Sequence, residues 1–299
     1  MADGGFTETE LTEGYLAPGA TESPEFAALV DEAAILSTEQ QGHVADLHEH
    51  DSWGVDAATQ RFTFTAPDGA TLDCRAHLLG SAAPGPGTWL WGWVNANGFP
   101  DAFFARAASV RDTADAPELT TAELPLAPGL PLRLTIAAKA VTGITAHYSA
   151  PVGGGTRIWM LIEHPSLELP APTVFRTMEA VRVTLDSVQL IDHRAAMRAW
   201  AGQRGVPVRA AEPDADAAPG GETLAFDLSD GELVVQFDAQ HRLVRMRAEV
   251  EPPRATEPPA DDAPADELPA PEPQPSTAPE GPADAPKPRG FLSRLLGRG

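Results

Sequence analysis

Three polar residues, Asp73, Arg75 and His77, alternate along one predicted strand and are the best placed for chemistry. Alternate residues of an extended chain share a face, so a carboxylate, a guanidinium and an imidazole would lie side by side. If that face lines a cavity, the three could bind a small molecule or act in general acid/base catalysis. The pattern favours the alternative, the solvent-facing side of a half-buried strand.

The densest set of metal-ligand residue types is formed by His43, His48, His50 and Asp51. A structural zinc site needs four ligands in a fixed geometry. His48 and His50 would point to opposite sides of an extended chain and lie far apart around a helix. We therefore expect a solvated, acidic helix end here, and no metal or cofactor.

Other residue types with reactive side chains also fit structural roles better. The single cysteine, Cys74, rules out an intramolecular disulfide or Cys-based zinc site, and its apolar strand face predicts an inert core thiol. Gly153–Gly155 precede a strand, whereas a phosphate-binding loop leads into a helix. Asp192 fits a helix N-cap better than an acid/base pair with His193. No catalytic residue is assigned.

A stripe of three tryptophans, Trp89, Trp91 and Trp93, lies in a segment predicted to be a central strand, Thr88 to Asn95. Both alternating faces of this segment are apolar, which suits a strand covered on both sides. Stacked indoles could form a ligand platform, but large aromatic side chains more often fill cores. Core packing is therefore the favoured interpretation.

The run G-T-W-L-W-G-W-V-N at 87–95 resembles an uncharacterised bacterial family defined as a domain of unknown function. Its G-x-W-x-W-x-W-x-N strand follows a hairpin and precedes a helix and a Gly-rich turn. The resemblance covers 24–205. It implies an intracellular globular domain with no known reaction, and it carries no catalytic residues over to this chain.

Helical periodicity and capping residues predict the main helices. A helix begins near Pro24 with Ser23 as its N-cap, because apolar residues then recur on one helical face. Further helices are predicted at 101–112, at 130–148 with a strand as the alternative, and at 192–203. Residues 174–190 mix strand-like and undecided stretches.

Turn residues fix the register of the predicted hairpins. With Pro67 to Gly69 as a three-residue loop, Phe64 opposes Leu72 and Phe62 opposes Cys74. Two further turns predict a C-terminal meander with one apolar face. With Asp230-Gly231 as the first turn, Leu228 opposes Leu233, Phe226 opposes Val235 and Leu224 opposes Phe237; with Gln240-His241 as the second, Phe237 opposes Val244, Val235 opposes Met246 and Leu233 opposes Ala248.

The predicted fold is α+β, a mainly antiparallel sheet of about seven or eight strands with helices packed on it. The alternative is two smaller subdomains, divided near residue 150 or before residue 223. Composition divides the chain into a disordered N-terminus at 1–22, a globular domain at 23–250, a Pro-rich acidic linker at 251–286 and a basic motif at 287–299.

Charge and hydropathy limit the classes of partner. A net charge of −22 argues against nucleic acid, which requires clustered basic residues. No apolar run approaches the roughly 18–20 residues that span a bilayer. The N-terminal residues lack the basic and apolar regions of a secretory signal, so we expect a cytoplasmic location.

The last 13 residues carry a charge of +4 after the acidic linker. On a helical wheel their four large apolar residues share one side, with arginines beside them. The predicted partner-binding residues are Arg289, Phe291, Leu292, Arg294, Leu295, Leu296 and Arg298. The first hypothesis is a non-enzymatic interaction protein that this motif tethers to a partner or an anionic membrane surface. The alternative is a small-molecule-binding protein or enzyme with a Trp-lined pocket that uses Asp73, Arg75 and His77.

Overall fold

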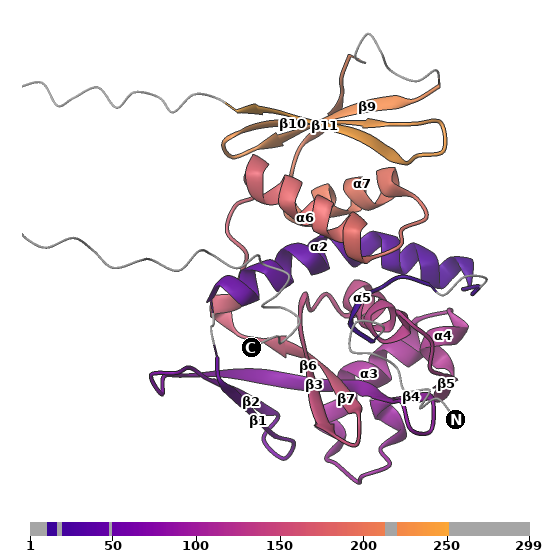
Figure 1. Cartoon of the computed structure of the whole chain (residues 1–299), viewed down its shortest axis with the longest axis vertical. Coiled ribbons are helices and arrows are strands. Elements are labelled where there is room, and N and C mark those ends of the chain that lie inside the picture. The colour runs from indigo at the N-terminus through magenta and orange to yellow at the C-terminus, as the bar shows by residue number, and fades with distance from the viewer. Residues whose placement is uncertain (1–10, 17–19, 48–49, 213–219, 251–299) are drawn as a thin grey trace, which may run out of the picture. The chain divides into compact units, whose positions relative to one another are not determined.

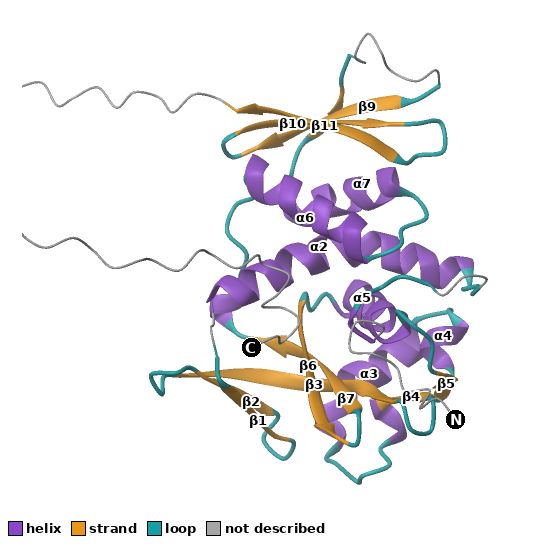
Figure 2. Ribbon diagram, in the orientation of Figure 1, coloured by secondary structure: helices purple, strands orange, loops and turns teal. Residues whose placement is uncertain are grey.

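The computed structural model describes residues 11–16, 20–47, 50–212 and 220–250 (Figures 1 and 2). Within them, the six helices are α2 (Pro24–Leu47), α3 (Asp101–Thr113), α4 (Pro117–Thr120), α5 (Leu130–Thr142), α6 (Val174–Ser187) and α7 (His193–Arg204). The first seven strands are β1 (Ser52–Asp56), β2 (Arg61–Thr65), β3 (Thr71–Ala83), β4 (Thr88–Trp91), β5 (Glu123–Pro125), β6 (Ala146–Gly153) and β7 (Thr156–Glu163). The other four are β8 (Val208–Ala210), β9 (Glu222–Leu228), β10 (Gly231–Phe237) and β11 (Leu243–Val250).

The predicted α+β fold with antiparallel strands is confirmed, and the strands form two sheets. β1 to β7 form the seven-stranded N-terminal sheet, and β8 to β11 form the four-stranded C-terminal sheet. In the N-terminal sheet the long strand β3 pairs with β2 and β4 along one edge and with β7 along the other. β3 is therefore the strand on which the remaining elements of this sheet are assembled.

The first predicted hairpin is confirmed residue by residue. Phe64 pairs with Leu72 and Phe62 with Cys74, and Gly69 has the positive φ of 84° that the loop requires. The apolar side chains on this face pack with Met160 of β7 in a separate buried cluster. Local turn chemistry and the alternating pattern agree here, which is why the register could be predicted.

The predicted strand at 88–95 is too long. β4 ends at Trp91, and a short 3₁₀ helix (Gly92–Val94) follows. A Cβ at Gly92 would lie only 2.8 Å from the carbonyl oxygen of Leu78, so glycine allows the chain to turn close to β3. Asn95 then adopts a left-handed conformation, and its amide bonds in both directions to the backbone of Phe99. These contacts end the strand.

Most of the predicted helices are confirmed at their caps. The Ser23 hydroxyl accepts from the amide of Phe26 at the start of α2. Asp192 caps α7, and Gly205 ends it in the left-handed conformation. The segment predicted as a helix at 130–148 is divided, because α5 ends at Gly143 and β6 then begins. The segment at 174–190, predicted to mix strand-like and undecided stretches, contains α6, so the strand-like interpretation is wrong.

α2 contacts α5 on one side and α6 and α7 on the other (Figure 1). Two adjacent glutamines of α2 also bind the edge of the N-terminal sheet. The Gln41 amide bonds to both the N–H and the C=O of His147 in β6. Gln40 donates to the carbonyl of Leu167 and accepts from the Thr145 hydroxyl. Gln41 thus satisfies two backbone groups of the edge strand β6, and Gln40 joins α2 to the segments beside it.

The described residues that precede α2 pack against α5 and α6. Arg133 in α5 is fully buried and forms a two-pronged ion pair with Glu22. Its third nitrogen donates to the carbonyls of Gly14 and Gln189. Leu11 is also buried. Of the segment predicted as a disordered N-terminus, residues 11–16 and 20–22 are thus joined to the folded body, and residues 1–10 lie outside the described residues.

The C-terminal sheet is the predicted meander with one of its two registers displaced. Leu228 pairs with Gly231 and Phe226 with Leu233, so the first turn is Ser229-Asp230 and not Asp230-Gly231. The slip is two residues, which keeps the same face apolar. The tip is held in place because the Asp230 carboxylate accepts from the amide of Val174, at the start of α6.

The second turn of the meander is confirmed. Val235 pairs with Met246 and Leu233 with Ala248, as predicted. A bulge then pairs Phe237 with Leu243 in place of Val244. His241 has a positive φ of 62°, the conformation that the predicted turn needed.

Candidate functional site

The candidate site lies where the helical cover of the N-terminal sheet ends. β3 and β7 are neighbours in the register, with Arg75 opposite Glu163 and His77 opposite Leu161. Leu161 is fully buried and His77 is 2% exposed, whereas Arg75 is exposed. The buried core of this face therefore changes to solvent within two residues along each strand.

His77 and Glu163 form a diagonal cross-strand pair at this boundary. The Nε2 atom of His77 lies 2.7 Å from a carboxylate oxygen of Glu163. The imidazole side chain is 3% exposed and the carboxylate side chain 41% exposed. Burial lowers the pKa of His77, and Glu163 opposes that shift. A neutral imidazole that donates its Nε2–H to the carboxylate satisfies both effects and fixes the orientation of Glu163.

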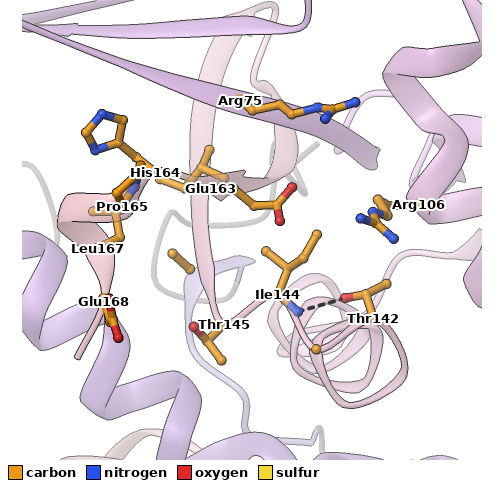
Figure 3. A pocket seen from close by; sticks show the side chains of 13 residues that line it. Arg75, Arg106, Thr142, Ile144, Thr145, Glu163, His164, Pro165, Leu167 and Glu168 are labelled. Atoms are coloured by element: carbon orange, nitrogen blue, oxygen red, sulfur yellow. Dashed lines mark hydrogen bonds between the residues drawn. The ribbon is translucent and has the colours of Figure 1, made fainter. Parts of the chain in front are cut away.

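Glu163 faces an open pocket of about 540 Å³ (Figure 3). Its wall includes residues from β3, α3, the end of α5, β7 and the turn after β7. The principal polar lining residues are Arg75, Arg106, Thr142, Thr145, Glu163 and Glu168. Figure 3 shows the Glu163 carboxylate on the side of the pocket where Arg75 and Arg106 lie.

A smaller pocket of about 210 Å³ adjoins the first between β3 and α3. His77 and Ser109 line it together with Arg75 and Arg106, which belong to both pockets. The two arginines thus stand between a small basic recess and the larger pocket that contains Glu163.

The charges around the larger pocket do not neutralise one another. Among the described residues, no ion pair joins Arg75, Arg106 and Glu163 to each other, although Arg75 and Glu163 are opposite in the register. Arg75 donates instead to the side chain of Gln60. The Arg106 guanidinium has no hydrogen bond or ion pair within the part of the chain that the structure describes. Such groups are available to a charged ligand.

Two of the three residues first predicted for chemistry reach this site. Arg75 and His77 line it, as their shared strand face indicated. Asp73 does not, because its carboxylate accepts from the Thr63 hydroxyl at 2.5 Å and lies 3.9 Å from Arg61 across the neighbouring strand. The prediction that Asp73 acts together with Arg75 and His77 is therefore wrong.

Sequence reasoning missed Glu163 and Arg106, the two residues that complete the site. Glu163 directly follows the strand that was predicted after Gly153–Gly155. Its partner in the structure, His77 of β3, is 86 residues away in the sequence. Arg106 is the residue of α3 that faces β3 across the smaller pocket. The pairing of β3 with β7 places Glu163 in the site, and the packing of α3 on β3 places Arg106 there. Nothing local in the sequence signals either contact.

The tryptophan stripe packs in the core and lines neither pocket. Trp89 and Trp91 are at most 1% exposed and meet edge to face, with ring centroids 5.5 Å apart. The Trp91 indole donates to the carbonyl of Glu118. Trp93 lies beyond the strand and stacks under the Arg111 guanidinium. The favoured interpretation is confirmed for the first two, and neither of the two pockets formed by the described residues contains a tryptophan.

The histidines considered as metal ligands do not converge within the described residues, where no group of three His, Cys, Asp or Glu could hold a metal ion. His50 bonds to the Tyr148 hydroxyl at 3.0 Å, and His43 lies in α2. His48 is outside the described residues.

Cys74 lies on the apolar strand face, as predicted. Its thiol is buried, and burial raises its pKa to about 11. Gly153 to Gly155, all with positive φ, form the turn between β6 and β7, which agrees with their predicted position before a strand.

The predicted partner-binding residues, Arg289, Phe291, Leu292, Arg294, Leu295, Leu296 and Arg298, lie outside the described residues, as does the predicted linker. No helix within the described ranges is both long and apolar enough to cross a membrane.

The model of one protein family matches residues 27–165, and its description is Family of unknown function (DUF6882). The predicted resemblance to a family of unknown function is confirmed over this segment. Arg75, Arg106 and Glu163 all lie within it, whereas α6, α7 and the C-terminal sheet lie outside it. No curated protein and no solved structure shows a significant match to the chain.

Proposed function

We propose that this chain is a non-enzymatic, cytoplasmic interaction protein with two contact elements. The charged pocket of the body binds a small polar ligand, and the basic C-terminal motif attaches the chain to an anionic membrane surface or a protein partner. One observation carries the first element: Arg75, Arg106 and Glu163 come from three different elements and surround an open pocket without pairing with one another.

The geometry of His77 favours binding over catalysis. Its Nε2 atom is engaged with Glu163, and its Nδ1 atom is buried with no partner among the described residues. A histidine in this position holds a carboxylate in place and cannot readily exchange protons with a bound substrate. Charge-assisted hydrogen bonds to the Arg106 guanidinium, and to the remaining donors of Arg75 and the remaining oxygen of Glu163, would supply the binding energy.

The pocket can be tested without knowing its ligand. The full chain is dialysed against the small-molecule fraction of a bacterial extract and recovered, and the retained compounds are released and weighed by mass spectrometry. We expect at least one chemically unchanged compound to be retained by the wild type and lost in Arg75→Gln/Arg106→Gln. The control is Arg176→Gln/Arg182→Gln, which removes the same charge from exposed positions of α6.

Identical retained compounds in the wild type and in the pocket variant would exclude the pocket as the binding element. A retained compound that is converted during the incubation would instead indicate an enzyme. The control variant should behave as the wild type in either case.

The second element rests on charge. Residues 1–250 and the linker are acidic and would be repelled by an anionic surface, whereas residues 287–299 carry +4. Each basic residue near such a surface contributes about 1 kcal/mol, and apolar side chains between the arginines could insert. The proposal is that the linker separates the acidic body from the surface that the motif binds.

Sedimentation with anionic and neutral vesicles tests the attachment with three forms of the chain: full length, truncated after Pro286, and Leu295→Asp. We expect only the full-length chain to sediment, and only with anionic vesicles. If no form sediments, a protein that only the full-length chain captures would support the partner version. If all three forms behave alike in both assays, the motif is not an attachment element.

A further inference from the structure

We propose that the larger pocket takes a small zwitterion of the α-amino-acid class. Its carboxylate would be bound by Arg75 and Arg106, and its ammonium group by Glu163. The proposal rests on the proposed function, since it names the class of ligand that the same pocket binds.

The cationic side of the pocket fits a single carboxylate. Arg75 on β3 and Arg106 on α3 line both pockets, so their guanidinium groups border the same space from two elements. Within the described residues the Arg75 guanidinium donates one hydrogen bond, 3.2 Å to the Gln60 side chain from a single nitrogen, which leaves its other donors for a ligand. Planar guanidinium groups bind carboxylates with paired hydrogen bonds.

The acidic groups of the same pocket fit a cation, and the Glu163 carboxylate lies on the side of the two arginines (Figure 3). One Glu163 oxygen accepts from the buried His77, which leaves the other oxygen to accept from a ligand. Thr142 and Gly143, at the C-terminal end of α5, line the same pocket, and a helix C-terminus carries partial negative charge. Glu168 adds a further carboxylate. An ammonium group is the ligand group that suits these carboxylates and the end of α5.

The net charge of the chain favours a zwitterion over an anionic ligand. The chain carries −22, so its overall field repels phosphate esters and dicarboxylates. Glu163 and Glu168 within the pocket would repel a dianion further. A zwitterion has no net charge, and each of its two charged groups can meet a side chain of opposite sign. The pocket therefore selects for two charges of opposite sign on one small molecule.

The larger pocket also has the volume and the apolar lining to hold the side chain of a bound amino acid. A volume of about 540 Å³ is within the range of roughly 300–1,000 Å³ typical of small-molecule sites. Ile144, Pro165 and Leu167 contribute apolar surface to it. An aliphatic amino acid such as leucine could place its side chain there.

Calorimetry with the full chain tests the proposal. The probes are leucine, glycine, serine and phenylalanine, with two analogues that each keep one end of leucine: 4-methylpentanoate lacks the ammonium group and 3-methylbutylamine lacks the carboxylate. The variants are Glu163→Gln and Arg106→Gln, and the matched controls are Glu25→Gln and Arg182→Gln at exposed sites. Thermal melts establish that each variant is folded. Arg106 is exposed, so its variant keeps the test valid if Glu163→Gln unfolds.

We expect an amino acid to bind and each one-ended leucine analogue to bind at least about tenfold more weakly than leucine, as the loss of a charge-assisted hydrogen bond implies. Glu163→Gln should weaken the binding of the amino acid by a similar factor. The affinity for 4-methylpentanoate should stay unchanged or increase. Arg106→Gln should weaken the binding of the amino acid and of 4-methylpentanoate. The control variants should change neither affinity.

The proposal is overturned if no amino acid binds, or if 4-methylpentanoate equals leucine and Glu163→Gln has no effect. In those cases the compounds retained from the extract decide separately on the proposed function. A retained compound of another class, lost in Arg75→Gln/Arg106→Gln, would leave the pocket as a binding element and reject only the amino-acid class.

Discussion

The two sheets of this chain place polar groups very differently beneath their helices. The inner face of the C-terminal sheet is apolar throughout, and Leu224, Phe226, Leu233, Val235 and Phe237 are at most 1% exposed. The region of the N-terminal sheet buries ionisable groups as well: Arg133 and Lys139 in α5, and His77 and His147 in the sheet. Burying such groups costs free energy unless each finds a partner.

This difference indicates that the N-terminal region loses some stability by burying ionisable groups and gains specific contacts in return. The family model matches the region that contains the buried ionisable groups and the pocket, and it stops before the C-terminal sheet. We infer that binding belongs to the N-terminal sheet, while the C-terminal sheet contributes apolar packing through α6 and α7. Substitutions that act on one kind of core or the other test this division.

The largest effect is expected where a charge enters the apolar core of the C-terminal sheet. Phe226→Asp should lower the free energy of unfolding by about 5 kcal/mol or more, because it removes a fully buried ring and buries an unpaired carboxylate. Asp227→Ala, the exposed neighbour, should cost less than about 0.5 kcal/mol. Denaturant melts compare the two, and equal costs would contradict the assigned faces.

A slightly smaller loss is expected from the buried ion pair on the N-terminal side. Arg133→Leu leaves the Glu22 carboxylate, whose side chain is 7% exposed, without its partner, and should cost about 3–5 kcal/mol. Arg133→Leu/Glu22→Leu should restore part of that loss, because no charge is then left buried. If the single variant costs as little as a surface substitution, the segment before α2 is not held by this pair in solution.

A pH-dependent effect is expected at Lys139. Its amine is buried and donates to the Ser37 hydroxyl, and burial lowers its pKa well below the usual value. The unfolded chain then binds up to one more proton than the folded chain between the lowered pKa of the folded state and about pH 10.4, so stability should rise with pH in that window. Lys139→Met removes this contribution.

The measurement is the free energy of unfolding of the wild type and Lys139→Met at several pH values between 7 and 10. The variant should be as stable as the wild type or more stable at pH 7, and its advantage should shrink by at most about 1.4 kcal/mol per pH unit. Ser37→Ala should keep the pH dependence. A constant difference across the range would mean that Lys139 is charged in the folded protein.

The smallest effect is expected from removal of the basic motif. Truncation after Pro286 should change the melting temperature by less than about 1 °C if the motif binds an external surface. A larger decrease would mean that the motif docks on the chain's own acidic body. Differential scanning calorimetry at low and high salt separates the two, because a docked basic segment would be released by salt.

Local patterns predicted the parts of the fold that neighbouring residues determine. The Phe62/Phe64 hairpin and the positive φ of His241 followed from turn chemistry, and the N-cap of α7 followed from Asp192. The end of β4 could not be predicted, because it depends on how closely Gly92 approaches Leu78 of another strand. The displaced meander turn likewise depends on contacts with α6.

The same limit applies to the site. The alternation of Arg75 and His77 identified one wall of the pocket, because strand periodicity is local. Glu163 and Arg106 are brought there by the pairing of β3 with β7 and by the packing of α3 on β3, which no local pattern encodes. The burial of Arg133 and Lys139 is also tertiary, since their partners lie in other segments of the chain.

Hydrogen exchange of the full chain, with and without an equimolar mixture of the proteinogenic amino acids, tests most directly whether binding belongs to the N-terminal sheet. Peptides that cover β3, α3 and β7 should exchange more slowly with the mixture present, and the protection should be lost in Arg106→Gln but kept in Arg182→Gln. Peptides from β9 to β11 should be unchanged. Protection of the C-terminal sheet, or of neither sheet, would contradict the account.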